Sequence, residues 1–133
     1  MTISPDPTVL LVDDSSSVRA ALGAMLTHHG YVPRPARNGA HGVEVYRATV
    51  GVVAAILDVQ MPVMDGPATF DALRALDPNL PCVFVSGDTA PYTEAELLAR
   101  GAFAVLGKPV DLDRLGIILA AIAPRAVPPD TGA

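Results

Sequence analysis

Short apolar runs alternate five times with longer segments of helical spacing, and this alternation limits the fold more than any other feature. Runs such as "TVLLV" and "VVAAIL" are apolar throughout, which is typical of strands buried on both faces of a sheet. Such strands, linked by helices, predict a parallel sheet with helices on both faces. We predict strands at 8–12, 31–37, 52–57, 82–86 and 102–106, and helices at 16–30, 38–49, 66–76, 93–100 and 111–123.

The second predicted strand, "YVPRPAR", contains two prolines that fix its place in the sheet. Pro33 and Pro35 lack N–H groups on the same side of the strand, so a neighbour on that side would lose hydrogen bonds. This strand is therefore expected at a sheet edge. Among the common doubly wound arrangements, an edge position for the second strand favours the order 2-1-3-4-5. We predict an α/β, flavodoxin-like fold.

The length of 133 residues, half of them apolar, suits one domain with a well-filled core. Both ends are rich in proline and small polar residues. We expect the folded domain over 8–123, with flexible tails at 1–7 and 124–133.

Charge and hydropathy exclude several function classes. The net charge is −5 with no basic cluster, which argues against nucleic-acid binding. The longest apolar stretches are too short to span a bilayer, and the first residues do not resemble a secretory signal. The single cysteine, Cys82, lies in an apolar run and is expected to be a buried thiol in a reduced compartment. We therefore expect a cytoplasmic protein that binds neither nucleic acid nor membrane.

Polar side chains follow four of the predicted strands at the point where each strand ends. Asp13 and Asp14 follow the first strand, Asp58 the third, Ser86 the fourth and Lys108 the fifth. Lys108 is the only lysine beside eight arginines, so the sequence keeps one compact point charge here. Because the carboxyl ends of parallel strands meet at one edge of the sheet, where ligands bind, we expect these five side chains to lie together.

Each of these residues has a simpler interpretation when it is taken alone. Asp13 and Asp14 suit helix caps, with three following serines as competitors, and Asp58 suits a solvated turn. The serine hydroxyl and the lysine suit a turn and an exposed surface. Together, however, three neighbouring acids repel one another and require a counter-charge. A divalent cation with oxygen ligands supplies it, and Mg²⁺ fits few carboxylates and several retained waters best.

Four sequence blocks together resemble a known family. The blocks "LLVDDS", "ILDVQMPVMDG", "VFVSGD" and "LGKPV" are similar to the motifs of response-regulator receiver domains of two-component signalling, as in chemotaxis regulators. The resemblance covers roughly residues 8–123. It implies that Asp58 accepts a phosphoryl group from a histidine kinase or a histidine phosphotransfer protein. It also implies that Asp13, Asp14, Asp58 and the backbone carbonyl of Gln60 bind Mg²⁺, with Mn²⁺ as an alternative.

The resemblance assigns roles to the remaining residues of these blocks. Lys108 would pair with a phosphoryl oxygen, and Pro109, often joined by a cis peptide in the family, would aim its loop. The hydroxyl of Ser86 would donate to another phosphoryl oxygen and so act in the switch between states. Asp65 and Gly66 are expected to be structural, forming a turn and the start of a helix.

The chain departs from the family at its switch aromatic. That residue usually lies three positions before the lysine, where this chain has Val105, and Val110 replaces an aromatic that often follows the proline. Phe103 lies two residues before Val105 and should share its strand face. Two hypotheses follow: Phe103 partly substitutes for the aromatic, or the switch relies on movement of the loop and the fourth helix alone.

Several functions are compatible with these residues. The first is a single-domain response regulator, monomeric or weakly dimeric, that controls binding of a downstream protein and is not an enzyme in the usual sense. The second is a receiver segment of a hybrid histidine kinase, or a phosphate sink or relay. A hydrolase with an aspartyl-phosphate intermediate is disfavoured because Gln60 stands where such enzymes place a second aspartate. A degenerate receiver is disfavoured because the set of acids, hydroxyl and lysine is complete.

Overall fold

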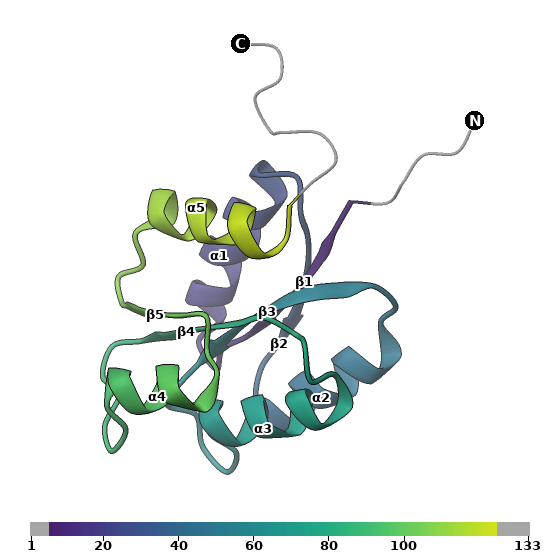
Figure 1. Ribbon diagram of the computed structural model, residues 1–133. Helices are drawn as coiled ribbons and strands as arrows, with labels where there is room; N and C mark the ends of the chain where they lie inside the picture. The colour runs from purple at the N-terminus through teal and green to yellow at the C-terminus, as the bar shows by residue number, and fades with distance from the viewer. Residues whose placement is uncertain (1–5, 125–133) are drawn as a thin grey trace, which may run out of the picture.

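The computed structural model describes residues 6–124 and contains five strands and five helices in strict alternation (Figure 1). The elements are β1 (Thr8–Val12), α1 (Ser16–His28), β2 (Val32–Ala36), α2 (Gly39–Ala48), β3 (Val52–Asp58), α3 (Gly66–Leu76), β4 (Cys82–Ser86), α4 (Glu94–Arg100), β5 (Ala104–Gly107) and α5 (Leu112–Ile122). The predicted element types are all confirmed, and most boundaries differ by only one or two residues. The predicted tails lie outside the described residues except for Asp6, Pro7 and Pro124.

The five strands form one parallel sheet in the order β2-β1-β3-β4-β5, as predicted. β2 lies at an edge and pairs only with β1, where Pro33 is opposite Val9 and Pro35 is opposite Leu11. The missing proline donors therefore cost the sheet no hydrogen bonds to a second neighbour. Before β1, the carbonyl oxygen of Pro7 accepts a hydrogen bond of 2.9 Å from Val32 N, so the sheet contacts begin within the predicted tail.

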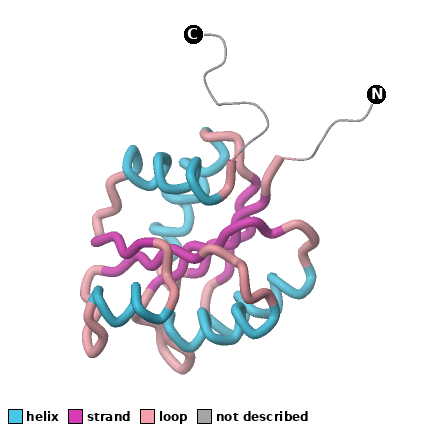
Figure 2. The backbone as a smooth tube through the Cα atoms, viewed as in Figure 1, coloured by secondary structure: helices cyan, strands magenta, loops and turns pink. Residues whose placement is uncertain are grey.

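Helices cover both faces of the sheet (Figures 1 and 2). α1 and α5 lie on one face, and α2, α3 and α4 lie on the other. Each face has its own apolar cluster: Leu26 and Leu119 belong to the first, and Phe70 and Leu97 to the second. β1, β3 and β4 supply side chains to both clusters, which is why their sequences are apolar apart from Thr8, Asp58 and Ser86 at strand ends.

Local sequence signals explain where the helices begin. Ser15, Asn38 and Asp65 each accept a hydrogen bond from a backbone N–H of the first turn of α1, α2 and α3. Thr93 and Glu96 form a capping box at α4, and the side chain of Asp111 caps α5.

The two glycines of α2 let this helix approach the sheet closely. Gly39 and Gly42 are buried, and a Cβ atom at Gly42 would lie 2.7 Å from Cγ2 of Val12. Glycines weaken an isolated helix, as the sequence indicates, but here they allow α2 to pack against the end of β1. This contact supports the residue that precedes Asp13.

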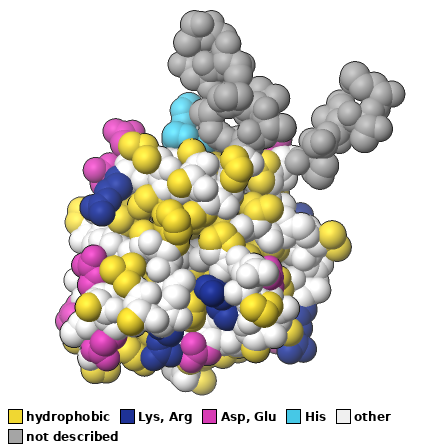
Figure 3. All heavy atoms as spheres, in the orientation of Figure 1, with side chains coloured by type: hydrophobic (Ala, Val, Ile, Leu, Met, Phe, Trp, Pro, Cys, Tyr) yellow, Lys and Arg dark blue, Asp and Glu magenta, His cyan; other side chains and the backbone are white. Residues whose placement is uncertain are grey.

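One face of the molecule carries exposed apolar side chains. Figure 3 shows them gathered over the region where α4 and α5 border β5. Exposed large hydrophobic residues in or beside these elements are Leu98, Phe103, Leu112 and Ile117. Within residues 6–124, no helix combines the length and the apolar character needed to cross a bilayer.

Candidate functional site

The carboxyl ends of four strands bring the predicted site residues to one rim of the sheet. Asp13 directly follows β1, Asp58 ends β3, Ser86 ends β4, and Lys108 directly follows β5. Asp13, Asp58 and Ser86 are buried, whereas Asp14 is exposed. The rim is therefore a partly enclosed polar site at the end of an apolar sheet.

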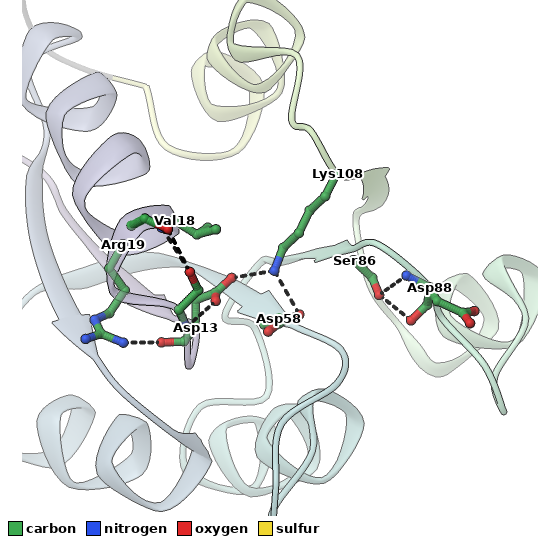
Figure 4. Close-up of polar contacts among 9 residues, drawn as sticks. Asp13, Val18, Arg19, Asp58, Ser86, Asp88 and Lys108 are labelled. Atoms are coloured by element: carbon green, nitrogen blue, oxygen red, sulfur yellow. Dashed lines mark hydrogen bonds and ion pairs between the residues drawn. The ribbon is translucent and has the colours of Figure 1, made fainter.

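Lys108 joins the two buried carboxylates (Figure 4). Its Nζ lies 2.9 Å from Oδ2 of Asp13 and 3.4 Å from Oδ1 of Asp58. The two carboxylate side chains are 0% and 5% exposed, and that of Lys108 is 23% exposed. Water screens such buried pairs only weakly. Because Lys108 contacts both carboxylates, it is the main counter-charge of the site.

Burial sets the protonation of Asp58. Burial of the carboxyl, followed by the charge of Asp13, raises the pKa of Asp58 from 3.8 to about 6, and Lys108 opposes this rise. Burial by itself lowers the pKa of Lys108, but hydrogen bonds and charge from the two aspartates outweigh it and raise that pKa. At neutral pH the site thus holds a charged lysine and a carboxylate that is poised close to its protonation range.

The acidic residues fit a divalent cation. Asp13, Asp14 and Asp58 each offer a carboxylate oxygen, and these oxygens lie within 4.8 Å of one another. Oδ2 of Asp13 is buried and forms an ion pair with the ammonium of Lys108. A group of carboxylate oxygens that converge at one end of the sheet is the kind of ligand set that Mg²⁺ prefers.

The hydroxyl of Ser86 is directed toward its own loop. It donates to the backbone carbonyl of Asp88 and accepts a hydrogen bond of 3.1 Å from Asp88 N. Figure 4 shows these bonds on the side of Ser86 away from Asp58. The structure thus places Ser86 at the rim but does not bring its hydroxyl to Asp58.

Gln60 and Tyr92 link the loop after β3 to the loop after β4. Nε2 of Gln60 donates to the carbonyl of Ala90 over 2.9 Å, and the hydroxyl of Tyr92 donates to Oδ2 of Asp65 over 2.9 Å. These loops border a cleft of about 450 Å³. Sequence reasoning missed Tyr92, because a contact across 27 residues leaves no local signal.

Gly66 and Pro109 shape the loops of the site. A Cβ atom at Gly66 would collide with the carbonyl oxygen of Asp58 and lie 2.8 Å from Cα of Val59. Only glycine therefore lets α3 begin this close to Asp58. The peptide bond between Lys108 and Pro109 is cis.

Comparison with known proteins agrees with this geometry. The family model of the response regulator receiver domain matches residues 9–120. This chain belongs to that family. The receiver domain is 35% identical over 114 residues to the sensor kinase CckA of Brucella abortus, which covers 85% of the chain and 12% of that protein. It is 36% identical over 107 residues to the transcriptional regulatory protein ZraR of Escherichia coli, which covers 80% of the chain and 24% of that protein.

Solved receiver structures share the fold along nearly their whole length. The chemotaxis protein CheY4 of Vibrio cholerae has a TM-score of 0.80 and 29% identity, over 88% of this chain and 98% of that one. A response regulator receiver protein of Pseudomonas putida has a TM-score of 0.82 and 27% identity, over 90% and 99% of the two chains. By contrast, the receiver domain spans only 12–25% of the length of the curated relatives described above and others like them.

The expected departure of this receiver domain from its family lies at β5. Val105 is half-buried against the cluster that contains Phe84 and Leu97. Phe103 precedes the first residue of β5 and is 51% exposed. Tyr92, on the loop after β4, packs against the same cluster as Val105.

Proposed function

We propose that Asp58 accepts a phosphoryl group from a phosphohistidine of a kinase or phosphotransfer protein, and that the modified chain then changes its affinity for a downstream protein. The observation that carries this proposal is the position of Asp58. Its carboxylate ends β3 beside two further acids, with the only lysine of the chain 3.4 Å away. A nucleophile next to a cation site and a fixed positive charge suits phosphoryl transfer.

In the transfer step, a carboxylate oxygen of Asp58 attacks phosphorus and forms an O–P bond. The P–N bond of the donor breaks, and its electron pair leaves with the imidazole, which takes up a proton from water. Asp58 must be ionised to attack, so its pKa of about 6 predicts faster transfer above pH 6 than below it. The ammonium of Lys108 would then contact a phosphoryl oxygen in place of the Asp58 carboxylate.

Asp13, Asp14, Asp58 and the backbone carbonyl of Gln60 would hold Mg²⁺ together with water. When bound, this ion offsets the negative charge that the acceptor and the phosphoryl oxygens share. Asp13 would supply a buried oxygen, and the exposed Asp14 would supply one at the solvent side of the site. Mn²⁺ satisfies the same oxygen ligands.

Ser86 would connect the phosphoryl group to the binding surface. Its hydroxyl would leave the backbone of Asp88 and donate to a phosphoryl oxygen, which frees the loop before α4. The downstream protein would bind the apolar face over α4, β5 and α5 (Figure 3). The two hypotheses for the switch remain: Phe103 moves inward, or the loop and α4 move alone.

The setting of the domain is a separate proposal. A single-domain regulator, monomeric or weakly dimeric, is the simplest reading. A receiver segment of a hybrid kinase, or a relay or phosphate sink, uses the same chemistry. The relatives include a sensor kinase and a transcriptional regulatory protein, so segments similar to this chain occur within both kinds of protein.

Intact mass spectrometry tests the proposal. Wild type and Asp58→Asn are incubated with phosphoramidate, with Mg²⁺ or with a chelator. We expect one added phosphoryl group in the wild type with Mg²⁺ and none in the other three samples. An unmodified wild type that also consumes no donor would contradict the proposal, whereas donor consumption without added mass indicates rapid hydrolysis of the product.

A further inference from the structure

Several hydrogen bonds hold the backbone and the side chain of Asp13 in place. Its backbone N–H donates to the carbonyl of Ala36 over 3.2 Å, which extends the contact between β1 and β2. Its Oδ1 accepts a hydrogen bond of 2.9 Å from Ser15 N. These bonds fix one carboxylate oxygen and the start of the backbone turn, and leave Oδ2 facing Lys108.

Arg19 provides a third support, from the side opposite Lys108 (Figure 4). Nη1 of Arg19 donates to the carbonyl oxygen of Asp13 over 2.7 Å. Arg19 lies in the first turns of α1 and is half-buried. Among the described residues, Arg19 is the donor to that carbonyl oxygen, and Asp13 itself is fully buried. The contact joins α1 directly to the rim.

The positive charge of Arg19 would weaken the binding of a cation at this site, so any favourable effect of Arg19 must have another origin. A guanidinium next to three carboxylates lowers the negative potential of the site and repels a divalent cation. The carboxylates already have Lys108 as a counter-charge. What Arg19 adds is a charged hydrogen bond to the main chain of Asp13, which limits how the buried carboxylate can turn. Supports of this kind usually strengthen metal binding by orienting a ligand.

We propose that Arg19 is a positioning residue for the metal site and acts through the carbonyl of Asp13. The inference rests on the proposed function, because it takes Asp13 to be a metal ligand. Two physical effects of removing Arg19 then have opposite signs. Loss of positive charge strengthens Mg²⁺ binding, and loss of orientation weakens it, so the sign of the change separates positioning from electrostatics.

The test is an Mg²⁺ titration of ¹⁵N-labelled protein followed by amide NMR spectra, without any phosphodonor. Arg19→Met removes the donors and keeps an apolar stem of similar length. We expect Mg²⁺ to bind this variant about tenfold more weakly than the wild type, the lower end of the range for groups that orient metal ligands. Arg19→Lys should bind about threefold more weakly, because one flexible ammonium replaces the planar fork.

Arg47→Met is the matched control. Arg47 is exposed in the last turn of α2, and its side chain makes no hydrogen bond or ion pair among residues 6–124. The Arg47→Met substitution removes one positive charge and leaves the contacts of Asp13 unchanged, so the affinity for Mg²⁺ should stay within about twofold of the wild type.

Each outcome decides something. Unchanged or tighter binding in Arg19→Met overturns the inference, because charge alone predicts that result. If the spectra show that Arg19→Met does not fold, Arg19→Lys decides, and wild-type affinity in that folded variant overturns the inference. A wild type that does not bind Mg²⁺ overturns the proposed metal site and this inference together, whereas a wild type that binds leaves the proposed site intact whatever the variants do.

Discussion

The interior of the sheet and its rim are both buried, yet burial has opposite effects in the two regions. Ile56 and Phe84 lie within β3 and β4 and are fully buried among apolar side chains. Asp58, two residues beyond Ile56, is only 3% exposed but carries a charge. Burial of Ile56 and Phe84 stabilises the fold because it removes apolar surface from water. Burial of the Asp58 carboxylate destabilises it because the charge loses its hydration.

The difference shows that the rim lowers the free energy of unfolding in order to hold the charged groups of the site. Lys108 offsets part of the cost of the buried carboxylates, but the raised pKa of Asp58 shows that the offset is incomplete. The rim therefore holds unfavourable negative charge that a bound cation can relieve. Substitutions in the interior should lower the free energy of unfolding, whereas removal of the buried charge of Asp58 should raise it.

The largest effect is expected in the interior. Phe84 is fully buried, and its ring lies 5.6 Å from that of Phe70 between centroids. Phe84→Ala should lower the free energy of unfolding by about 4 kcal/mol, because it leaves a cavity. Urea denaturation measures this, with Phe103→Ala as the control. Phe103 is 51% exposed, so a loss as large there would contradict the contrast between interior and surface.

The rim should respond with the opposite sign. Asp58→Asn removes a buried charge, and Lys108 keeps Asp13 as its partner. We expect the free energy of unfolding at pH 7, without Mg²⁺, to rise by about 3 kcal/mol, as a pKa shift of this size implies. The exposed Glu44→Gln is the control and should change little. A destabilised Asp58→Asn would refute the view that the rim is strained by charge.

The pH dependence sharpens the same comparison. The pKa of Asp58 is about 6 in the folded protein and 3.8 without the fold, so between these values the folded state binds more protons than the unfolded state. Stability is therefore expected to fall as pH rises from about 4 to about 6, by about 2 kcal/mol, and this component should be absent in Asp58→Asn. Denaturation of both proteins across this range measures the difference, and parallel curves would exclude Asp58 as its source.

The smallest effect concerns the backbone of the rim. Val63 lies on the loop between β3 and α3 with φ of 70° and an exposed side chain, a conformation that branched residues avoid. Val63→Gly should stabilise the fold by about 0.5 kcal/mol, because relief of this strain exceeds the added entropy of glycine in the unfolded chain. Val50→Gly, at an exposed position outside that region, should not stabilise. Equal effects at both positions would show that Val63 is not strained.

The sequence was sufficient for the architecture because the relevant signals are local. Uniformly apolar runs predicted the buried parallel strands, and Pro33 and Pro35 placed β2 at the edge, which fixed the order of the sheet. Capping residues such as Thr93 and Asp111 are local signals of the same kind, because each stands directly before the helix that it caps. The rim followed from the topology, because parallel strands end on the same side.

Side-chain directions and long-range contacts could not be predicted in the same way. The sequence places Ser86 at the end of β4 but does not show that its hydroxyl bonds the backbone of Asp88. It gives no sign that Arg19 reaches back to the carbonyl of Asp13, or that Tyr92 bonds Asp65. Such contacts depend on rotamers and loop conformations that only the packed structure selects.

The central claim is that Asp58, and no other acid of the rim, carries the phosphoryl group. Reductive trapping tests it most directly: borohydride converts an aspartyl phosphate to homoserine, and peptide mass spectrometry then locates the converted residue. After incubation with phosphoramidate and Mg²⁺, the account predicts homoserine at position 58 and intact aspartate at positions 13 and 14. Conversion at Asp13 or Asp14 in place of Asp58 would contradict it.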